Sequence, residues 1–272
     1  MENKKVPKEL KVQRFGLSTP AIAAAVLRMV RDRQWEPNAK HLDIGSGGGE
    51  LIEMSRQEFG FQSWACDYTD KLMQVAGQKV EIVDLNHDPL PYETGSFDLV
   101  TFTEVIEHIE HCRRSIREIY RVLKQGGLVV VTTPNILNLK SRMRYLCFGF
   151  HNLFGPLHVH ESAIYNSDGH INPISYFYLA HALLDANFTA LKLGVDKLQR
   201  SSIGLLFPLW MPIKLAAFFM QRTERLKFKT IDEINEPLVK AINSKEILLG
   251  RTIVVAASKP KGVVLPAATS AQ

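Results

Sequence analysis

The sequence predicts an α/β fold in which helices flank a doubly wound, mostly parallel sheet of seven strands. Short apolar segments alternate with segments of helical periodicity, a pattern typical of βαβ units. A glycine-rich turn follows the first predicted strand, and acidic residues stand where the first three strands end. The 272 residues are enough for one large domain with a sizeable core.

The predicted strands are short apolar runs closed by turn-forming or acidic residues. They are His41–Ile44, Ser63–Cys66, Val80–Val83, Phe97–Thr103, Leu128–Thr133, Ala190–Val195 and Thr252–Ala257. Because the helices between the first five strands form crossovers, these strands should run parallel, with right-handed connections.

The predicted helices place apolar residues three and four positions apart. The first follows Ser18-Thr19-Pro20, where a hydroxyl can cap the free amides and proline suits the first turn. Gly126-Gly127 should stop the helix that follows the fourth strand. The expected helices are Ala21–Val30, Glu50–Phe59, Glu104–Leu123, Tyr176–Ala186 and most of 203–247.

This pattern divides the chain into a single central domain and two ends. We expect a basic N-terminal tail over 1–17, one domain over 18–258 and a disordered tail over 259–272. A helical cap should be inserted after the fifth strand, with cap segments at 135–170 and 203–247.

Composition excludes several classes of protein. The three cysteines, Cys66, Cys112 and Cys147, form no CxxC pair, so a disulfide framework or zinc knuckle is not expected. The basic N-terminus is not followed by an uninterrupted apolar segment, so we expect no signal peptide. A cytoplasmic location fits best. The net charge of +5 permits an anionic partner without requiring one, and we expect no nucleic acid.

The most apolar stretch, Ile203–Met220, contains Pro208, Pro212 and Lys214, which argue against a membrane-spanning helix. Four basic residues follow closely, in 222–229. Apolar residues beside basic ones suit peripheral contact with an anionic membrane, at the inner face for a cytoplasmic protein. A buried cap or a dimer contact is the simpler interpretation, and the oligomeric state is left open.

Several polar residues fall at the carboxyl ends of predicted strands. Asp43, Asp67, Asp84 and Thr103 each end one of the first four. Ligands of open parallel sheets bind beyond these ends, so the four side chains should line one rim.

The turn after the first strand is the sharpest signal. Glycines at 45, 47 and 49 allow positive φ and close approach of a ligand to the backbone. The dinucleotide pattern G-x-G-x-x-G fails, because its last position falls on Glu50. A carboxylate there would repel a pyrophosphate, so the loop suits a ligand with a cationic part and no phosphate.

The segment Asp43–Gly49 resembles the S-adenosylmethionine loop of class I methyltransferases, a Rossmann-like family. Further similarity lies in 88–91, 95–100 and 120–127. The resemblance implies that the loop passes the methionine part of S-adenosylmethionine, that Asp67 holds the ribose hydroxyls, and that Asp84-Leu85 flanks the adenine. The cofactor-binding residues expected on this basis are Asp43, Gly45, Ser46, Gly47, Gly49, Asp67, Tyr68, Asp84, Leu85 and Thr103.

An acidic and histidine-rich segment follows the fourth strand. At helical spacing, Glu104, Glu107, His108 and His111 would share one face. The segment resembles two methyltransferase branches, which act on small-RNA 3′ ends and on catechol-like hydroxyls in ubiquinone biosynthesis. The RNA branch implies a divalent ion, Mg²⁺, Mn²⁺ or Zn²⁺, bound by Glu104, Glu107, His108 and a later histidine. His170 is ranked first, with His158 or His160 as substitutes.

These residues suggest O-methylation, because a hydroxyl nucleophile needs help to lose its proton. Without a metal, His108 would act as general base and Glu107 would orient it. The overall pattern resembles bacterial methyltransferases of glycan or lipid-linked biosynthesis. A quinone precursor or an RNA hydroxyl is the alternative acceptor, and a non-catalytic S-adenosylmethionine-binding partner protein is the alternative of another class.

Overall fold

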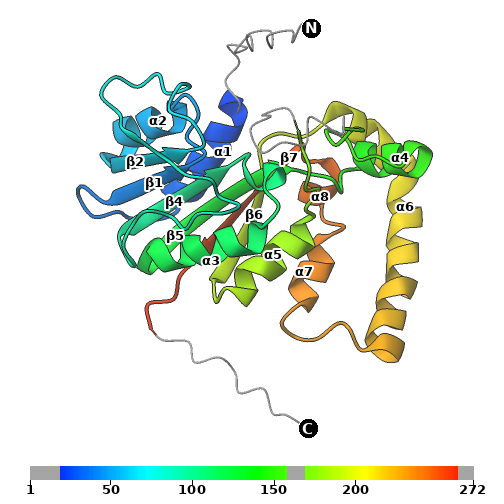
Figure 1. The fold of residues 1–272 in the computed structure, drawn as a ribbon. Coiled ribbons are helices and arrows are strands. Elements are labelled where there is room, and N and C mark those ends of the chain that lie inside the picture. Colours follow the sequence, from blue (N-terminus) through cyan, green and yellow to red (C-terminus); the bar gives the residue numbers. More distant parts are fainter. Residues whose placement is uncertain (1–18, 158–168, 263–272) are drawn as a thin grey trace, which may run out of the picture.

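A computed structural model of the chain describes residues 19–157 and 169–262. The first seventeen residues, His158, His160 and the last ten residues lie outside the described ranges, so the predictions made for them stay untested. The fold is a seven-stranded sheet between layers of helices, with a long helix standing apart at one end (Figure 1).

The strands follow the order β3-β2-β1-β4-β5-β7-β6. Strands β1 to β5 are parallel, and β7 runs antiparallel between β5 and β6, so the prediction of a doubly wound, mostly parallel sheet is confirmed. The strands are β1 (Lys40–Ile44), β2 (Gln62–Asp67), β3 (Val80–Ile82), β4 (Phe97–Thr103), β5 (Leu123–Pro134), β6 (Thr189–Val195) and β7 (Thr252–Ser258).

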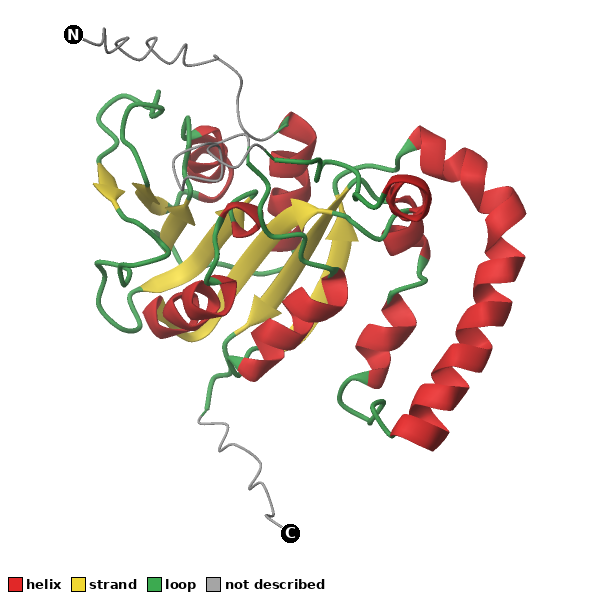
Figure 2. Cartoon of the chain, turned by 45° about the vertical axis from the view of Figure 1, so that its right-hand side comes forward, coloured by secondary structure: helices red, strands yellow, loops and turns green. Residues whose placement is uncertain are grey.

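Helices are distributed over both faces of the sheet and beyond its β6 edge (Figure 2). They are α1 (Pro20–Arg31), α2 (Glu50–Phe59), α3 (Cys112–Val122), α4 (Leu139–Phe148), α5 (Tyr176–Asp185), α6 (Arg200–Thr223), α7 (Glu236–Ala241) and α8 (Lys245–Leu249). A short 3₁₀ helix, η1 (Ile106–His108), follows β4, and a π-helical turn, η3 (Glu224–Phe228), extends α6.

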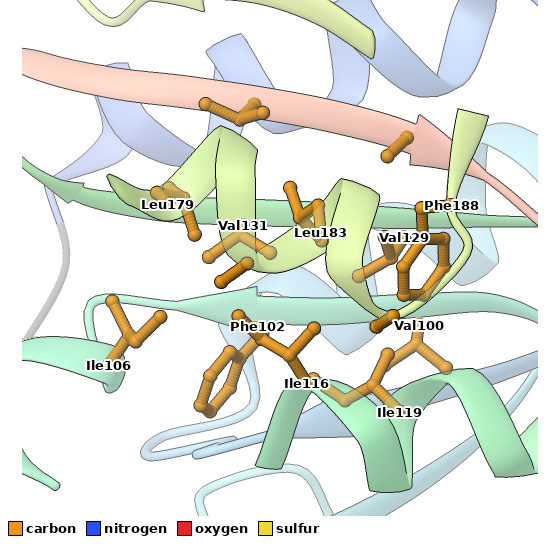
Figure 3. Packing of buried hydrophobic residues seen from close by; sticks show 14 of the residues in the cluster. Val100, Phe102, Ile106, Ile116, Ile119, Val129, Val131, Leu179, Leu183 and Phe188 are labelled. Carbon is orange, nitrogen blue, oxygen red and sulfur yellow. The ribbon is translucent and has the colours of Figure 1, made fainter. Parts of the chain in front are cut away.

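The central strands bury both faces, and their side chains alternate between two apolar cores. On β5, Val129 and Val131 join the core under α3 and α5, whereas Leu128 and Val130 join the core under α1 and α2. Figure 3 shows the first core, where Phe102 of β4 packs among residues of β5, α3 and α5. This double burial is the usual state of a parallel sheet and fixes the strand register.

The predicted helix Glu104–Leu123 is wrong over residues 104–111. Glu104 has a φ of 53°, a left-handed value that a helix does not allow, and only the three residues of η1 follow before α3 begins at Cys112. The carbonyl of Glu107 accepts the amides of Ile171 (3.0 Å) and Asn172 (2.9 Å), a distant segment. Glu104, Glu107, His108 and His111 therefore do not share a helix face.

Helix α6 runs through Pro208 and Pro212 without a break, in agreement with the helix expected over most of 203–247. One smaller expectation needs correction. Lys259, expected to begin a disordered tail, is held in place, because its Nζ donates to the carbonyls of Tyr120 (2.7 Å) and Leu123 (2.8 Å).

Replacing Phe102 should test the main core. Its side chain is fully buried, so Phe102→Ala should lower the free energy of unfolding by about 3–5 kcal/mol through lost transfer energy and the cavity left behind. Ile82 of the edge strand is 65% exposed, and Ile82→Ala should cost under about 0.5 kcal/mol. Urea denaturation measures both, and equal losses would contradict this assignment of the core.

Candidate active site

A cavity of about 1070 Å³ opens at the carboxyl ends of the parallel strands. The four residues expected at the rim, Asp43, Asp67, Asp84 and Thr103, all line it. The order of β2, β1 and β4 explains this, because neighbouring parallel strands end at the same edge of the sheet.

The glycine loop forms one wall of this cavity, and two of its positions require glycine. Gly45 has φ +72° and Gly49 has φ +81°, values that other residues seldom adopt. A Cβ on Gly49 would also lie 2.6 Å from Sδ of Met73. The loop backbone can therefore pass close to a ligand, as the sequence pattern predicts.

Asp67 at the end of β2 is oriented by the loop itself. One oxygen of its carboxylate accepts a hydrogen bond from the backbone amide of Gly47 (2.8 Å). The other oxygen accepts one from the backbone amide of Tyr68 (2.7 Å). Burial raises the pKa of Asp67 even though these hydrogen bonds favour the charged form. A carboxylate has about four acceptor positions, so both oxygens can still accept hydroxyl groups.

Asp84 and its neighbours form the far end of the cavity. Burial alone would raise the pKa of Asp84, but hydrogen bonds from His87 (2.9 Å) and the Asn86 amide (3.0 Å) outweigh it and lower the pKa. Asn86, which the sequence analysis missed, lines the cavity, and its buried side-chain nitrogen has no partner among the described residues. This nitrogen is a donor suited to a heterocycle.

A series of hydrogen bonds between buried polar side chains ends on the carboxylate of Asp43. The Thr101 hydroxyl donates to Asp43 (2.6 Å) and accepts Nε2–H of His41 (2.7 Å), while Nδ1 of His41 faces the Ser63 hydroxyl (3.2 Å). Burial lowers the pKa of His41 to about 3, so this ring is neutral. Burial raises the pKa of Asp43 to about 7, and nearby Asp67 adds to the rise.

The other side of the cavity is built by docking a remote segment onto η1. Besides the amides of Ile171 and Asn172 on the Glu107 carbonyl, Nδ1 of His108 donates to the carbonyl of Gly169 (3.0 Å). These hydrogen bonds hold residues 169–172 against residues 106–109. His170 therefore lies beside His108, although more than sixty residues separate the two in the sequence.

Glu107, His108 and His170 come together in this docked region. Each offers one potential ligand atom, and these atoms lie within 4.8 Å of one another. Nδ1 of His170 faces the carbonyl of Leu153 (2.8 Å). Because carbonyl oxygens only accept, Nδ1 carries a proton in both rings, so Nε2 is the nitrogen that offers a lone pair when the ring is neutral.

Glu107 is the most deeply buried acid of the site. Its side chain is 0% exposed, and neither carboxylate oxygen has a hydrogen-bond partner among the described residues. Burial raises its pKa well above the usual value, and the neighbouring Glu104 raises it further. Such a group needs a proton or a bound cation.

Glu104 lines the same cavity but stands outside this group of three. The Thr132 hydroxyl accepts the Glu104 amide (3.0 Å) and donates to its carboxylate (2.9 Å), which holds the residue in its left-handed conformation. Burial raises the pKa of Glu104 to about 7, although Arg251 opposes this rise.

Most of the site residues expected from the sequence line this single cavity. Among those that the structure describes, only Gly49 does not; it is the N-cap residue that precedes α2. Sequence reasoning missed Thr101, Thr132 and Arg251, of which Arg251 lines the cavity itself. Their only signal is a position at the end of a neighbouring strand, next to a predicted acid.

Comparisons with known proteins address the family. Residues 42–131 match the methyltransferase domain family. A ubiquinone biosynthesis O-methyltransferase of Xanthomonas oryzae pv. oryzae is 37% identical over 105 residues, which cover 36% of this chain and 44% of that protein. A ubiquinone/menaquinone biosynthesis C-methyltransferase of Rhizobium johnstonii is 31% identical over 107 residues, covering 35% and 42%. The chain thus matches less than half the length of these relatives.

Residues 42–131 are thus similar to a methyltransferase domain, as the resemblance of the glycine loop to class I methyltransferases leads us to expect. The fold agrees: a methyltransferase structure from Archaeoglobus fulgidus, 17% identical, aligns over 88% of this chain and 93% of its own length with a TM-score of 0.51. A phosphoethanolamine N-methyltransferase of Haemonchus contortus, 20% identical, aligns over 88% of this chain and 52% of its own length with the same score.

The similarity to methyltransferases points to S-adenosylmethionine as the ligand of this cavity. Residues 43–48 of the glycine loop and the carboxylate of Asp67 both line the cavity, where the resemblance would have them bind the methionine and ribose parts. Buried acids at Asp43 and Asp67 favour a ligand with cationic sulfonium and ammonium groups.

Replacing Asp43 should change how stability depends on pH. The folded pKa of about 7 lies above the ordinary 3.8, so the folded state binds the proton more tightly. For this group the free energy of unfolding falls as pH rises from about 4 to about 7. The variant Asp43→Asn has no such group, so its free energy of unfolding should not fall for this reason. The difference in free energy of unfolding, variant minus native, should therefore rise by at least about 1 kcal/mol between pH 5 and pH 8.

Denaturant unfolding at both pH values measures this difference. The contribution of His41 has the opposite sign below pH 6.5 but is present in both proteins, so it cancels in the comparison. A difference that does not vary with pH would mean that Asp43 is ionised at pH 5.

Proposed function

We propose that this chain transfers the methyl group of S-adenosylmethionine to a hydroxyl of a small acceptor. The observation that carries the proposal is the group Glu107, His108 and His170, which lines the cofactor cavity beside the end of β4. The sulfonium supplies an activated methyl group, so the protein has to align the acceptor, exclude water and remove its proton.

Proton removal is the task of the two imidazoles. Because both rings hold their proton on Nδ1, Nε2 is the basic atom of each. In the metal-free scheme, Nε2 of His108 accepts the acceptor's proton. Nδ1, the nitrogen that an orienting carboxylate would hold, bonds the Gly169 carbonyl instead, so Glu107 is not needed to orient this ring.

The same three residues fit a divalent cation. Histidines that bind metals usually donate their other ring N–H to a carbonyl or carboxylate, as both do here. The unpartnered, buried carboxylate of Glu107 would gain a counter-charge. Two nitrogens and a carboxylate suit Zn²⁺, Mn²⁺ or Mg²⁺, and three protein ligands leave positions open for an acceptor hydroxyl, whose pKa the cation would lower. We place Glu104 outside this ligand set.

The acceptor is proposed to carry neighbouring hydroxyls on a sugar or an aromatic ring, since such a pair can chelate a cation. A glycan or lipid-linked biosynthetic intermediate is the first candidate. A quinone precursor is the second, and the relative from Xanthomonas oryzae pv. oryzae, named as a ubiquinone biosynthesis O-methyltransferase, favours it. An RNA hydroxyl has no support from these relatives.

Cofactor turnover tests the function itself. Purified protein with methyl-labelled S-adenosylmethionine should release S-adenosylhomocysteine when given the right acceptor pool: membrane lipid extract, soluble sugar intermediates or a synthetic catechol. Asp67→Ala should weaken cofactor binding by roughly 1.5–3 kcal/mol, the scale of hydrogen bonds to a charged group. Asp70→Ala, an exposed acid three residues later, is the matched control and should change nothing.

Binding of the cofactor without turnover in any pool would favour the alternative of a non-catalytic binding partner. Label in the lipid pool, the sugar pool or the catechol identifies the acceptor class directly.

Metal removal is the second test. Chelator treatment should abolish turnover, and Mn²⁺, Mg²⁺ or Zn²⁺ should restore it. Titration calorimetry with Mn²⁺ should show one site that His108→Ala and His170→Ala both remove, whereas Glu104→Gln keeps it. Full activity in chelator, with loss in His108→Ala but not in His170→Ala, would rule out the ion and leave the general-base scheme.

A further inference from the structure

Helix α6 and its π-helical extension form a long apolar arm outside the methyltransferase core. Together they span Arg200–Phe228, the one helix of the described ranges that is long and apolar enough to cross a membrane. None of its most apolar 18-residue stretch is buried. Figures 1 and 2 both show the arm standing apart from the sheet, beyond α7 and α8.

The arm is apolar on two opposite sides, and only one is covered. Leu205, Leu206, Leu209 and Ile213 pack against a small cluster formed by α4 and α8. The opposite stripe has the same helical spacing and faces solvent. Its exposed fractions are Phe207 93%, Met211 71%, Leu215 61% and Phe218 61%. A soluble protein rarely exposes so continuous an apolar surface without a partner.

The arm does not cross a bilayer, because both its ends are tied to the same body. After η3 the chain returns through α7, whose Leu238 is buried in the main core. Arg225 near the far end of the arm pairs with Glu236 of α7 (2.5 Å). A helix held at both ends in this way fits a position parallel to a surface.

The basic residues at the end of the arm indicate an anionic partner. Four basic residues follow the apolar stripe: Arg222, Arg225, Lys227 and Lys229. The segment 214–230 contains only one acidic residue, Glu224, so this end of the arm is positively charged. In the middle of the arm, Lys214 lies over the ring of Trp210 at 4.6 Å. Basic groups flanking an apolar stripe with an amphipathic tryptophan complement anionic headgroups above an acyl layer. Two copies of the arm packed side by side in parallel would bring these like charges close together, and antiparallel packing would leave them without a partner of opposite charge.

We propose that α6 is a membrane-docking element that lies in the interface of an anionic lipid bilayer. Phe207, Met211, Leu215 and Phe218 enter the acyl region, and the basic residues of 222–229 bind the headgroups. The contact is independent of methyl transfer.

The position of α4 connects this surface to the cavity. Helix α4 packs against α6 and exposes Tyr145, Leu146 and Phe148. The chain then runs from α4 to Leu153, an exposed apolar residue that lines the cavity. If the proposed function holds, an amphiphilic acceptor can reach the cavity from the lipid surface along this short segment.

Vesicle flotation tests the docking. The full chain should float with phosphatidylcholine vesicles containing phosphatidylglycerol, float weakly with phosphatidylcholine alone, and be released by high salt. The triple variant Phe207→Ser, Met211→Ser, Leu215→Ser should lower the bound fraction by at least about tenfold, because it removes the inserted apolar stripe. Arg222→Gln with Lys227→Gln and Lys229→Gln should remove the preference for anionic lipid.

The matched control replaces equally exposed apolar residues elsewhere, Ile82→Ser and Tyr178→Ser, and should float as the native protein does. Binding of S-adenosylhomocysteine should be the same in all variants, which shows that each is folded and separates this test from that of the proposed function. Absence of flotation by the native chain, or unchanged flotation of the triple variant, would overturn the proposal. So would a concentration-dependent dimer that the triple variant abolishes, since a second copy would then cover the arm.

Discussion

The burial of several carboxylates around one cavity is the constraint on which the rest of the site depends. Burial raises the pKa of Asp43, Asp67, Glu104 and Glu107, and two of these rise to about 7. Removing a charged group from water costs energy unless a proton, a hydrogen bond or an opposite charge compensates it. The fold supplies hydrogen bonds to Asp43, Asp67 and Glu104, whereas within 19–157 and 169–262 no group stands at hydrogen-bond geometry to the Glu107 carboxylate. The site is therefore arranged for ligands that bring positive charge.

The parallel sheet makes this concentration of acids possible. Asp43 is the second-last residue of β1, Asp67 is the last residue of β2, and Glu104 directly follows β4. Because these strands are parallel neighbours, the order of the sheet brings the three acids to one edge. The strands beneath are buried on both faces and cannot slip without exposing a core. On the opposite wall, the Glu107 carbonyl holds the segment that carries His170. The rigid core thus fixes the half of the cavity lined by the glycine loop, and one docked segment completes the half lined by the histidines.

Local patterns in the sequence predicted that the glycine loop and the strand-end acids line one cavity, because glycine spacing and strand ends specify their positions. The other half depends on contacts between distant residues. The helix expected from Glu104 failed because the Glu107 carbonyl bonds 171 and 172 rather than an amide four residues ahead. His170 was ranked by resemblance, and no local pattern shows that Gly169 and Leu153 orient the two imidazoles. The helical character of 203–247 was predicted, but the long exposed helix α6 that contains Pro208 and Pro212 was not, because no local pattern shows which side of it stays uncovered.

Proton release on cofactor binding tests the central claim, that buried acids await a cation, most directly. At pH 6.5 Asp43, with a pKa of about 7, is largely protonated before binding, and a sulfonium and ammonium beside it should drive ionisation. Titration calorimetry of S-adenosylmethionine in buffers of different ionisation enthalpy counts the protons. The account predicts release that is clearly reduced in Asp43→Asn. Binding without proton release, or with the same release in both proteins, would contradict it.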